Sequence, residues 1–432
     1  MYRFIVLVFA MAPCGAMAAE LPAPVVDADY RHVDLEEAKL GQLLFYDPVL
    51  SGNQTVACAT CHHPRHGTSD GLSLGLGDGG EGLGPMRRAN PDNMPEQRIP
   101  RNSPALFNLG AHEFTVLFHD GRIAIDPTRP SGFRTPLDDD MAVGFASLLS
   151  AQTMFPVLSP DEMAGHYGEN DVSKAVRQGL ITGQGGAWDI IARRVAAIDA
   201  YADQFAAVYP HIEQADQIQF TDISNAIAVF MELEWRSDTA PFDAYLRDEA
   251  DLSEAATLGA NLFYGEAGCA TCHSGPFQTD HSFHAMGAPQ IGPGKAARFE
   301  SHARDEGRFR VTGNPMDAYK FRTPSLRNVA LTAPYGHAGA HATLEAFLES
   351  HLDPVAGLQA YDQTQAVLPN LEGDDFRVLG DEAEMASIAQ AVSTPSIALE
   401  QSEIAALIAF LDSLTDTAAM AGRLGIPDSV PS

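Results

Sequence analysis

The chain has 432 residues and a formal net charge of −30, with 45% hydrophobic and 19% charged residues. These fractions are typical of a globular protein, and the length allows two or three domains with a substantial core. The strong negative charge argues against nucleic acids and anionic membrane surfaces as partners.

The N-terminus has the pattern of a secretory signal peptide over residues 1–18. Arg3 provides the positive charge, residues 4–12 form a short apolar run, and residues 16–18 read Ala-Met-Ala, a typical cleavage site. The apolar run is too short to span a bilayer, and no other stretch of 18 or more apolar residues follows it. We therefore expect an exported, periplasmic protein without a membrane span.

The cysteines form two identical Cys-x-x-Cys-His motifs. The fifth cysteine, Cys14, lies in the signal segment, and the motifs read Cys58-Ala-Thr-Cys61-His62 and Cys269-Ala-Thr-Cys272-His273. Two thiols three positions apart can form thioethers to one haem, and the adjacent histidine can bind its iron. Zinc also takes cysteine and histidine ligands, but two identical motifs in an exported chain favour haem. We expect two covalently bound haem c groups, with His62 and His273 as proximal ligands.

A repeated segment precedes the two motifs. Residues 40–46 and 258–264 both fit Leu-Gly-x-x-Leu-Phe-Tyr on an amphipathic helix, followed by a short loop and the motif. This order is the opening of a cytochrome c domain, so two such openings predict two haem domains.

The remaining elements follow in chain order. Residues 71–104 are rich in Gly, Pro, Asn and Arg and predict a long loop, whereas residues 171–235 have helical apolar spacing. Residues 238–250 contain a proline and several acids, which indicates a domain boundary. A last apolar stripe from Ile404 to Leu414, with Ser402 as its N-cap, predicts a closing helix that packs on an opening helix.

The predicted fold is mainly α, with two cytochrome c-like haem domains and long irregular loops. The N-terminal domain covers residues 19–245, and the C-terminal domain covers residues 246–432.

The sixth ligand of each iron decides what each haem does. An iron with six protein ligands moves electrons, whereas an open face can bind peroxide or oxygen. Composition alone does not choose among the candidate ligands, which are His281, His284, Met286, Met316, His337, His341 and His351.

The sequence resembles the bacterial di-haem cytochrome c peroxidases and the related maturase MauG over most of the mature chain. Both Cys-Ala-Thr-Cys-His motifs carry the resemblance, together with blocks at residues 101–108 (RNSPALFN), 118–122 (FHDGR), 241–246 (PFDAYL), 321–329 (FRTPSLRNV) and 332–337 (TAPYGH).

The resemblance implies a ligand for the second haem. In the family a methionine or tyrosine lies 14 positions after the histidine of the PYxH block, and this position is His351 here. We therefore expect bis-histidine ligation by His273 and His351, with Met286 as the rival ligand. Because methionine ligation raises the haem potential, histidine in place of methionine at position 351 should make this haem a weaker oxidant.

The resemblance also implies an open first haem. Resting peroxidases often carry a distal histidine in the loop after the first motif, but residues 67–111 contain none, and His66 lies too close to His62 to serve. The family's distal glutamine, proline and glutamate match Gln152, Pro156 and Glu162. A shielded carboxyl group can take a proton from the near oxygen of peroxide and return it to the leaving oxygen. The alternative is that Glu162 is a solvated loop acid.

Two more family positions have counterparts in the chain. The tryptophan between the two haems is replaced by His119 in the FHDGR block, which could otherwise be a surface turn. The interdomain calcium ion of the family maps to Asn102, Thr332 and Pro334, whose neutral oxygen atoms suit calcium. These three residues could also simply pack the domain interface.

The leading functional hypothesis is a peroxidase that reduces hydrogen peroxide at the first haem and receives electrons through the second. Its reductant would be a small redox protein such as a cytochrome c or a cupredoxin, and the enzyme is a possible homodimer. One alternative is a MauG-like enzyme that oxidises side chains of a partner protein. Another is a non-catalytic electron-transfer cytochrome.

Overall fold

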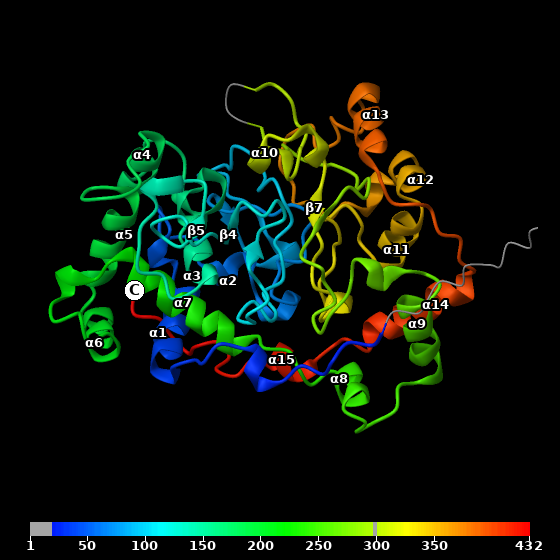
Figure 1. Ribbon diagram of the computed structural model, residues 1–432. Coiled ribbons are helices and arrows are strands. Elements are labelled where there is room, and N and C mark those ends of the chain that lie inside the picture. Colours follow the sequence, from blue (N-terminus) through cyan, green and yellow to red (C-terminus); the bar gives the residue numbers. More distant parts are fainter. Residues whose placement is uncertain (1–19, 297–299) are drawn as a thin grey trace, which may run out of the picture.

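The computed structural model describes residues 20–296 and 300–432, so the predicted signal peptide lies outside the described residues. The N-terminal and C-terminal halves of the chain lie side by side, with short strands and long loops between them (Figure 1). No helix among the described residues is both long enough and apolar enough to cross a membrane.

Helices dominate the structure, which confirms the mainly α prediction. The helices of the N-terminal half are α1 (Leu35–Tyr46), α2 (Cys58–Cys61), α3 (Leu148–Thr153), α4 (Asp171–Arg177), α5 (Ala187–Ala196), α6 (Asp199–Val208), α7 (Phe220–Glu234) and α8 (Pro241–Leu246). Those of the C-terminal half are α9 (Glu254–Tyr264), α10 (Phe309–Thr312), α11 (Leu344–Leu352), α12 (Pro354–Gln359), α13 (Glu382–Ala391), α14 (Gln401–Asp412) and α15 (Thr417–Ala421).

The strands are two or three residues long and all pair antiparallel. They form the sheets β1 (Gly80–Glu81) with β2 (Arg88–Ala89); β3 (Val116–Leu117) with β4 (Ile123–Ile125) and β5 (Phe133–Arg134); and β6 (Phe283–His284) with β7 (Phe321–Arg322). Such short ladders add little stability of their own, so they serve mainly to fix the loops that connect the helices.

The core of the N-terminal half is built on the crossing of α1 and α7. A Cβ atom at Gly41 would overlap with the carbonyl oxygen of Ala226, so only glycine allows the two helices to approach this closely. Phe45 and Phe230 meet beside the crossing with ring centroids 5.3 Å apart, and both side chains are buried. The apolar stripe predicted within residues 171–235 faces this core.

The core of the C-terminal half repeats that crossing with α9 and α14. Gly259 lies against the carbonyl oxygen of Ala406, and Phe263 meets Phe410 with ring centroids 5.0 Å apart. The predicted packing of the closing helix on an opening helix is therefore confirmed. The predicted N-cap was wrong, because the helix begins at Gln401, and Ser402 lies in its first turn.

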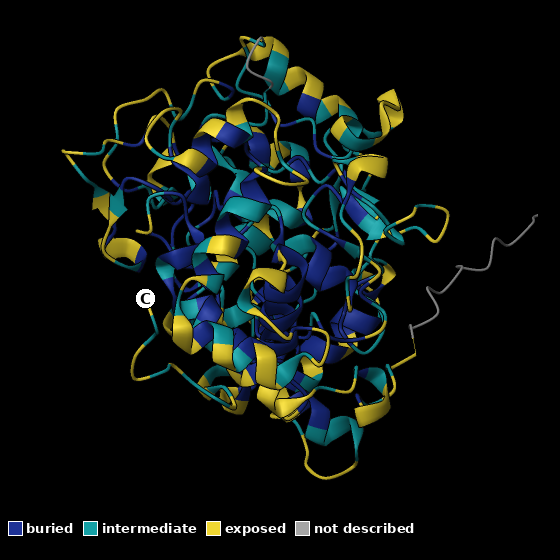
Figure 2. Cartoon of the chain, turned by 90° about the vertical axis from the view of Figure 1, so that its left-hand side faces the viewer, coloured by how far each residue is buried: buried dark blue, intermediate teal, exposed yellow. Residues whose placement is uncertain are grey.

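Figure 2 shows the buried residues concentrated in the central helices and the exposed residues on the outer turns and loops. This distribution is what amphipathic helices packed around shared cores produce.

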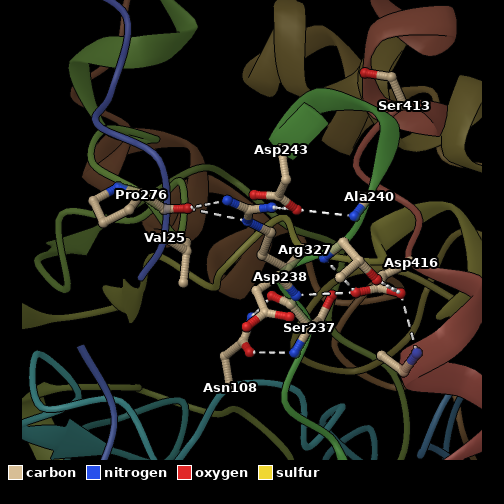
Figure 3. Close-up of polar contacts among 12 residues, drawn as sticks. Val25, Asn108, Ser237, Asp238, Ala240, Asp243, Pro276, Arg327, Ser413 and Asp416 are labelled. Atoms are coloured by element: carbon tan, nitrogen blue, oxygen red, sulfur yellow. Dashed lines mark hydrogen bonds and ion pairs between the residues drawn. The ribbon is translucent and has the colours of Figure 1, made fainter. Parts of the chain in front are cut away.

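A network of buried polar contacts ties the two halves together around α8 (Figure 3). Arg327 forms an ion pair with Asp243 at 2.7 Å, and neither side chain is exposed. The Arg327 guanidinium also donates to the carbonyl oxygen of Pro276, in the loop that follows His273. Asp416 accepts hydrogen bonds from the backbone N–H groups of Asp238 and Thr239.

The C-terminal segment returns to the N-terminal half. Ala419 packs in the core of that half, and the C-terminus lies beside α1 and α5 (Figure 1). The buried carboxylate of Glu234 accepts backbone hydrogen bonds from Arg423, Leu424 and Gly425. Residues 416–432 therefore pack on the N-terminal half, although the sequence assigned them to the C-terminal domain.

Candidate haem-binding and catalytic site

The first Cys-x-x-Cys-His motif forms a single helical turn, α2. Cys58 and Cys61 occupy its ends and are not joined by a disulfide. Burial raises the pKa of both thiols to about 12. Residues three apart on a helix face the same side, so both sulfur atoms can bond to one group.

The histidine after this turn is oriented by its Nδ1 atom. His62 Nδ1 lies 3.0 Å from the carbonyl oxygen of Thr68, and because a carbonyl only accepts, Nδ1 is the protonated nitrogen. Burial lowers the pKa of His62, which keeps the ring neutral and leaves a lone pair on Nε2. This is the usual arrangement of a metal-binding histidine.

The second motif is built in the same way. After α9, Cys269 begins a short 3-10 turn (Cys269–Thr271), and Cys272 is the residue that directly follows this turn. His273 Nδ1 lies 3.1 Å from the carbonyl oxygen of Gln278, and burial lowers the pKa of this histidine as well. Both imidazoles therefore present Nε2 as a potential ligand.

His351 lies opposite His273. It sits in the last turn of α11, whose N-cap Thr343 accepts a hydrogen bond from the N–H of Ala346. The ring centroids of His273 and His351 are 6.4 Å apart. Metal–imidazole bonds of about 2 Å on opposite sides of one metal put ring centres roughly 6 to 6.5 Å apart. Burial lowers the pKa of His351 to about 4, so it too is neutral.

The rival ligands of the second site have other partners or surroundings. The Sδ atom of Met286 accepts a hydrogen bond from Thr394 Oγ1 at 3.3 Å, and Met316 is 75% exposed. The histidine rivals contact other groups: His281 binds Glu113, His284 binds Asp280, His337 stacks on Phe321, and His341 binds Gln365. Among the candidates, His351 is the one whose ring pairs with that of His273.

The distal triad expected at the first site lies on one continuous segment. Gln152 is on α3, Pro156 begins a 3-10 turn (Pro156–Leu158), and Glu162 lies in a π-helical turn (Pro160–Ala164). The Oε1 atom of Gln152 is buried without a hydrogen-bond partner in the described chain. Burial chiefly raises the pKa of the Cys61 thiol, and the negative charge of Glu162 adds to that shift, so this carboxyl group lies within electrostatic range of the first motif.

Burial shapes the acidity of Glu162. Its pKa is raised, chiefly because burial penalises the carboxylate, although the positive charges of Lys295 and Arg122 oppose that shift. A carboxyl group with a raised pKa can hold and release a proton close to neutral pH.

Comparison with known proteins identifies the family of this chain. The model of the family described as di-haem cytochrome c peroxidase matches residues 35–251. The methylamine utilization protein MauG of Methylorubrum extorquens is 31% identical over 73% of this chain and 69% of the relative. The chain belongs to the di-haem cytochrome c peroxidase family.

Further relatives extend this similarity over more of the chain. The cytochrome c551 peroxidase of Nitrosomonas europaea is 28% identical over 85% of this chain and 89% of the relative. A crystal structure of a MauG-like protein associated with microbial copper homeostasis matches 95% of this chain and 97% of that protein, with a TM-score of 0.59 and 28% identity. As a member of this family, the chain is an oxidoreductase of the peroxidase type, and haem c is the cofactor that the family implies.

Two partly buried cations fit the carboxylate groups that a haem carries. Neither Arg322 nor Lys295 forms an ion pair with a carboxylate in the described part of the chain, and burial lowers the pKa of Arg322 to about 10. Both ring nitrogens of His337 are also buried without a partner among the described residues. Buried charges are costly unless they are paired, so an anionic group at this interface would stabilise the fold.

The FHDGR block lies at the interface between the halves and is not a surface turn. Asp120 is buried and binds Arg101 at 2.7 Å, and Arg101 also binds Asp305 of the C-terminal half at 2.6 Å. The carbonyl oxygen of His119 accepts a hydrogen bond from the N–H of Arg322 at 2.7 Å. Burial, reinforced by the charge of Arg101, lowers the pKa of His119 to about 3, so this histidine is neutral.

The residues expected to bind calcium are held at the same interface. The backbone N–H of Asn102 donates to His337 O at 2.9 Å, and its Nδ2 donates to Leu72 O at 2.8 Å. Thr332 packs against Gly67, and Pro334 is buried. The Oδ1 atom of Asn102 accepts no hydrogen bond from the described residues and can serve as a ligand.

Sequence reasoning missed two features of the site. Lys295 comes from a Gly-Pro loop of the C-terminal half and carries no motif that would have revealed it. The Gly-rich loop within residues 71–104 had no role assigned from the sequence. In the structure, the N–H of Asp78 in this loop donates to the carbonyl oxygen of Glu162 at 2.9 Å. At Gly77 a side chain would collide with the backbone of Glu162, so the loop needs glycine to support the distal carboxyl group.

Proposed function

We propose that the chain is a periplasmic di-haem peroxidase that reduces hydrogen peroxide to water at the first haem and receives two electrons through the second. The asymmetry between the two sites carries this proposal. An imidazole stands opposite His273, whereas a group that acts electrostatically on the first motif is the carboxyl group of Glu162.

The residues that would hold the haems follow from the two motifs. Cys58 and Cys61 would bond to the first haem with His62 as its iron ligand. Cys269 and Cys272 would bond to the second, with His273 and His351 on either side. The haem at His62 would supply an iron to which peroxide binds, and the haem at His273 would supply one-electron transfer.

Glu162 moves the proton that the reaction needs. Its carboxylate takes a proton from the near oxygen of peroxide and returns it to the far oxygen, which then leaves as water. The overall reaction consumes two electrons and two protons for each peroxide and gives two molecules of water. The unpartnered Oε1 of Gln152 accepts a hydrogen bond and so orients the peroxide, while Pro156 stiffens the turn between the two groups.

His119 and Arg322 connect the two sites. Their backbone hydrogen bond joins the FHDGR block of the first half to β7 of the second. A neutral histidine at this interface can donate a hydrogen bond to a haem carboxylate without adding charge. Asn102, Thr332 and Pro334 would bind a calcium ion that holds the same interface together.

A MauG-like activity is the second candidate. The enzyme would then draw its electrons from side chains of a partner protein and not from a cytochrome c or a cupredoxin. His351 in place of methionine favours this reading, as do the similarities to MauG and to a MauG-like protein. Histidine in place of tryptophan at position 119 argues against a route for charge between the haems that is identical to the route in MauG.

A non-catalytic electron-transfer cytochrome is the third candidate. It requires a sixth protein ligand at both haems. Buried Gln152 Oε1 and a carboxyl group of raised pKa serve no purpose in such a protein, which disfavours it.

The deciding experiment is an EPR spectrum of the fully oxidised holo-protein, recorded beside that of a His351→Met variant. One high-spin and one low-spin signal are expected, with a change in the variant that is confined to the low-spin signal. Two low-spin signals in the wild type would contradict the open first haem.

A turnover assay then separates the first two candidates. Peroxide consumption with a reduced cytochrome c or cupredoxin as donor is expected for the peroxidase. Slow turnover with every such donor, together with peroxide-dependent modification of a partner protein, would favour the MauG-like enzyme.

A further inference from the structure

Three potential metal ligands meet beside the turn that carries Glu162. Asp78 belongs to the Gly-rich loop, His166 follows the π-helical turn Pro160–Ala164, and Glu169 lies just before α4. One ligand atom from each residue lies within 4.8 Å of the other two. None of these residues takes part in the proposed peroxide chemistry.

His166 is the residue that points to a ligand. Its side chain is only 12% exposed, and both ring nitrogens are buried without a hydrogen-bond partner in the described chain. The carboxylate of Glu96 approaches Nδ1 only to 3.7 Å. A buried polar group without a partner destabilises the fold, so a ligand on this ring would offset that loss.

The carboxylates of Asp78 and Glu169 accept hydrogen bonds from neutral side chains, which fix their positions. Asp78 is 1% exposed and accepts hydrogen bonds from Thr55 Oγ1 at 3.0 Å and Asn53 Nδ2 at 2.9 Å. The same amide nitrogen of Asn53 donates to Glu169 Oε2 at 2.7 Å. No lysine or arginine of the described residues forms an ion pair with either acid, so both carboxyl groups are available to a metal ion.

We propose that Asp78, His166 and Glu169 bind a divalent transition-metal ion, such as zinc. One imidazole and two carboxylates suit zinc or manganese, whereas calcium prefers oxygen ligands alone. Three protein ligands leave a fourth position for water. Metal bonds of about 2.0–2.2 Å bring neighbouring ligand atoms to roughly 3.3 Å, so the three side chains move together by about 1 Å and the Asn53 amide turns aside.

The ion would brace the distal segment. Asp78 donates its N–H to Glu162 O, and the Nδ2 group of Asn170, beside Glu169, donates to Ala164 O at 3.0 Å. The middle and the C-terminal end of the turn that carries Glu162 are therefore attached to Asp78 and to the residue next to Glu169. Binding of the ion joins the Gly-rich loop to that turn through metal bonds in addition to hydrogen bonds.

The test is metal binding to the holo-protein. Chelator-treated holo-protein is titrated with zinc chloride by isothermal titration calorimetry, and bound zinc is counted after gel filtration by elemental analysis. One equivalent of tightly bound zinc is expected. Because the haem iron and the zinc are counted separately, this result is independent of peroxidase activity.

Variants assign the site to these residues. His166→Ala and Glu169→Gln are each expected to weaken zinc binding by at least about 100-fold, since loss of outer partners alone costs 10–100-fold. Glu169 is exposed, so its variant should keep the fold. His112→Ala, which removes a histidine outside the site, is the control and should bind as the wild type does.

Equal zinc binding in wild type and both site variants would overturn the proposal, because the ion would then sit on the acidic surface. Absence of a tight equivalent in the wild type would also overturn it.

Discussion

The two haem-binding halves share one scaffold and differ in what covers it. In each half a glycine of the opening helix allows close contact with a second helix. Gly41 of α1 packs on α7, and Gly259 of α9 packs on α14. In each half the proximal histidine donates its Nδ1 proton to a nearby carbonyl oxygen, that of Thr68 or Gln278. Up to this level the sites are copies of each other.

The difference lies in the segments that the repeat does not include. Opposite His273, helix α11 presents His351. Near the first motif, the turn after α3 brings Glu162, which has a raised pKa because of its burial. In the proposed function, the repeated helix pair would hold a haem in the same way in each half, and the inserted segments would determine whether its other face is closed or reactive.

The largest expected effect comes from removing the reactive carboxyl group. Glu162→Gln should lower the rate of peroxide reduction by about 10²–10⁴-fold, the usual contribution of a general acid–base group. Steady-state peroxide consumption by the holo-enzyme measures this. Asp161→Asn, one residue away on the same turn, is the matched control. Similar losses in the two variants would show that the turn had merely been disturbed.

The junction of the two halves beside the second motif should depend strongly on the buried ion pair between Asp243 of α8 and Arg327. Asp243→Ala leaves the buried guanidinium of Arg327 without its carboxylate, which should cost about 3–5 kcal/mol of unfolding free energy. Because Arg327 also binds the loop after His273, the low-spin EPR signal should broaden while the high-spin signal stays unchanged. The exposed pair of Lys39 with Glu36 is the contrast, since its loss should cost under about 1 kcal/mol. Denaturant unfolding compares the variants.

The halves should also differ in their response to pH. Burial raises the pKa of Glu232 on α7 from 4.5 to about 7, so its protonated form is favoured in the folded state. The contribution of Glu232 to the free energy of unfolding is fully present below pH 4.5 and is lost as pH rises through 7, a change of roughly 3 kcal/mol. Glu232→Gln should flatten this decline in denaturant unfolding measured from pH 4 to 8.

The corresponding acid of the second half provides the control for that experiment. Asp412 follows Ala406 by the same six positions that separate Glu232 from Ala226, but it is exposed. Asp412→Asn should therefore leave the pH dependence of stability unchanged. An equal effect of both substitutions would contradict the assignment to Glu232.

The smallest effects should come from the shared crossings. Gly41→Ala and Gly259→Ala each force a methyl group against a helix backbone, which typically costs about 1–3 kcal/mol. If the scaffolds are equivalent, the two losses should be similar, with Gly41→Ala changing the high-spin EPR signal and Gly259→Ala the low-spin one. Very unequal losses in thermal unfolding would show that one crossing is looser than the other.

Sequence reasoning was most successful where the pattern is local. The helices around Leu40 and Leu258, the helical stretch 171–235 and the closing helix all follow from apolar periodicity, and the structure contains them. The N-cap was misplaced at Ser402 because Glu403 reaches back to the N–H of Glu400 and starts the helix earlier. The domain boundaries, the calcium ligands and the roles of the site residues remain predictions.

By itself the sequence determined the two haem-attachment motifs, the helical class and the family, because each depends on residue spacing along a continuous stretch. The tertiary structure alone decided which distant groups meet. It paired His351 with His273, brought Lys295 and Arg322 to the interface, joined Asp78 to Glu162 and His166, and returned residues 416–432 to the first half. Local spacing does not specify such contacts, because they depend on how helices and loops far apart in the chain pack together.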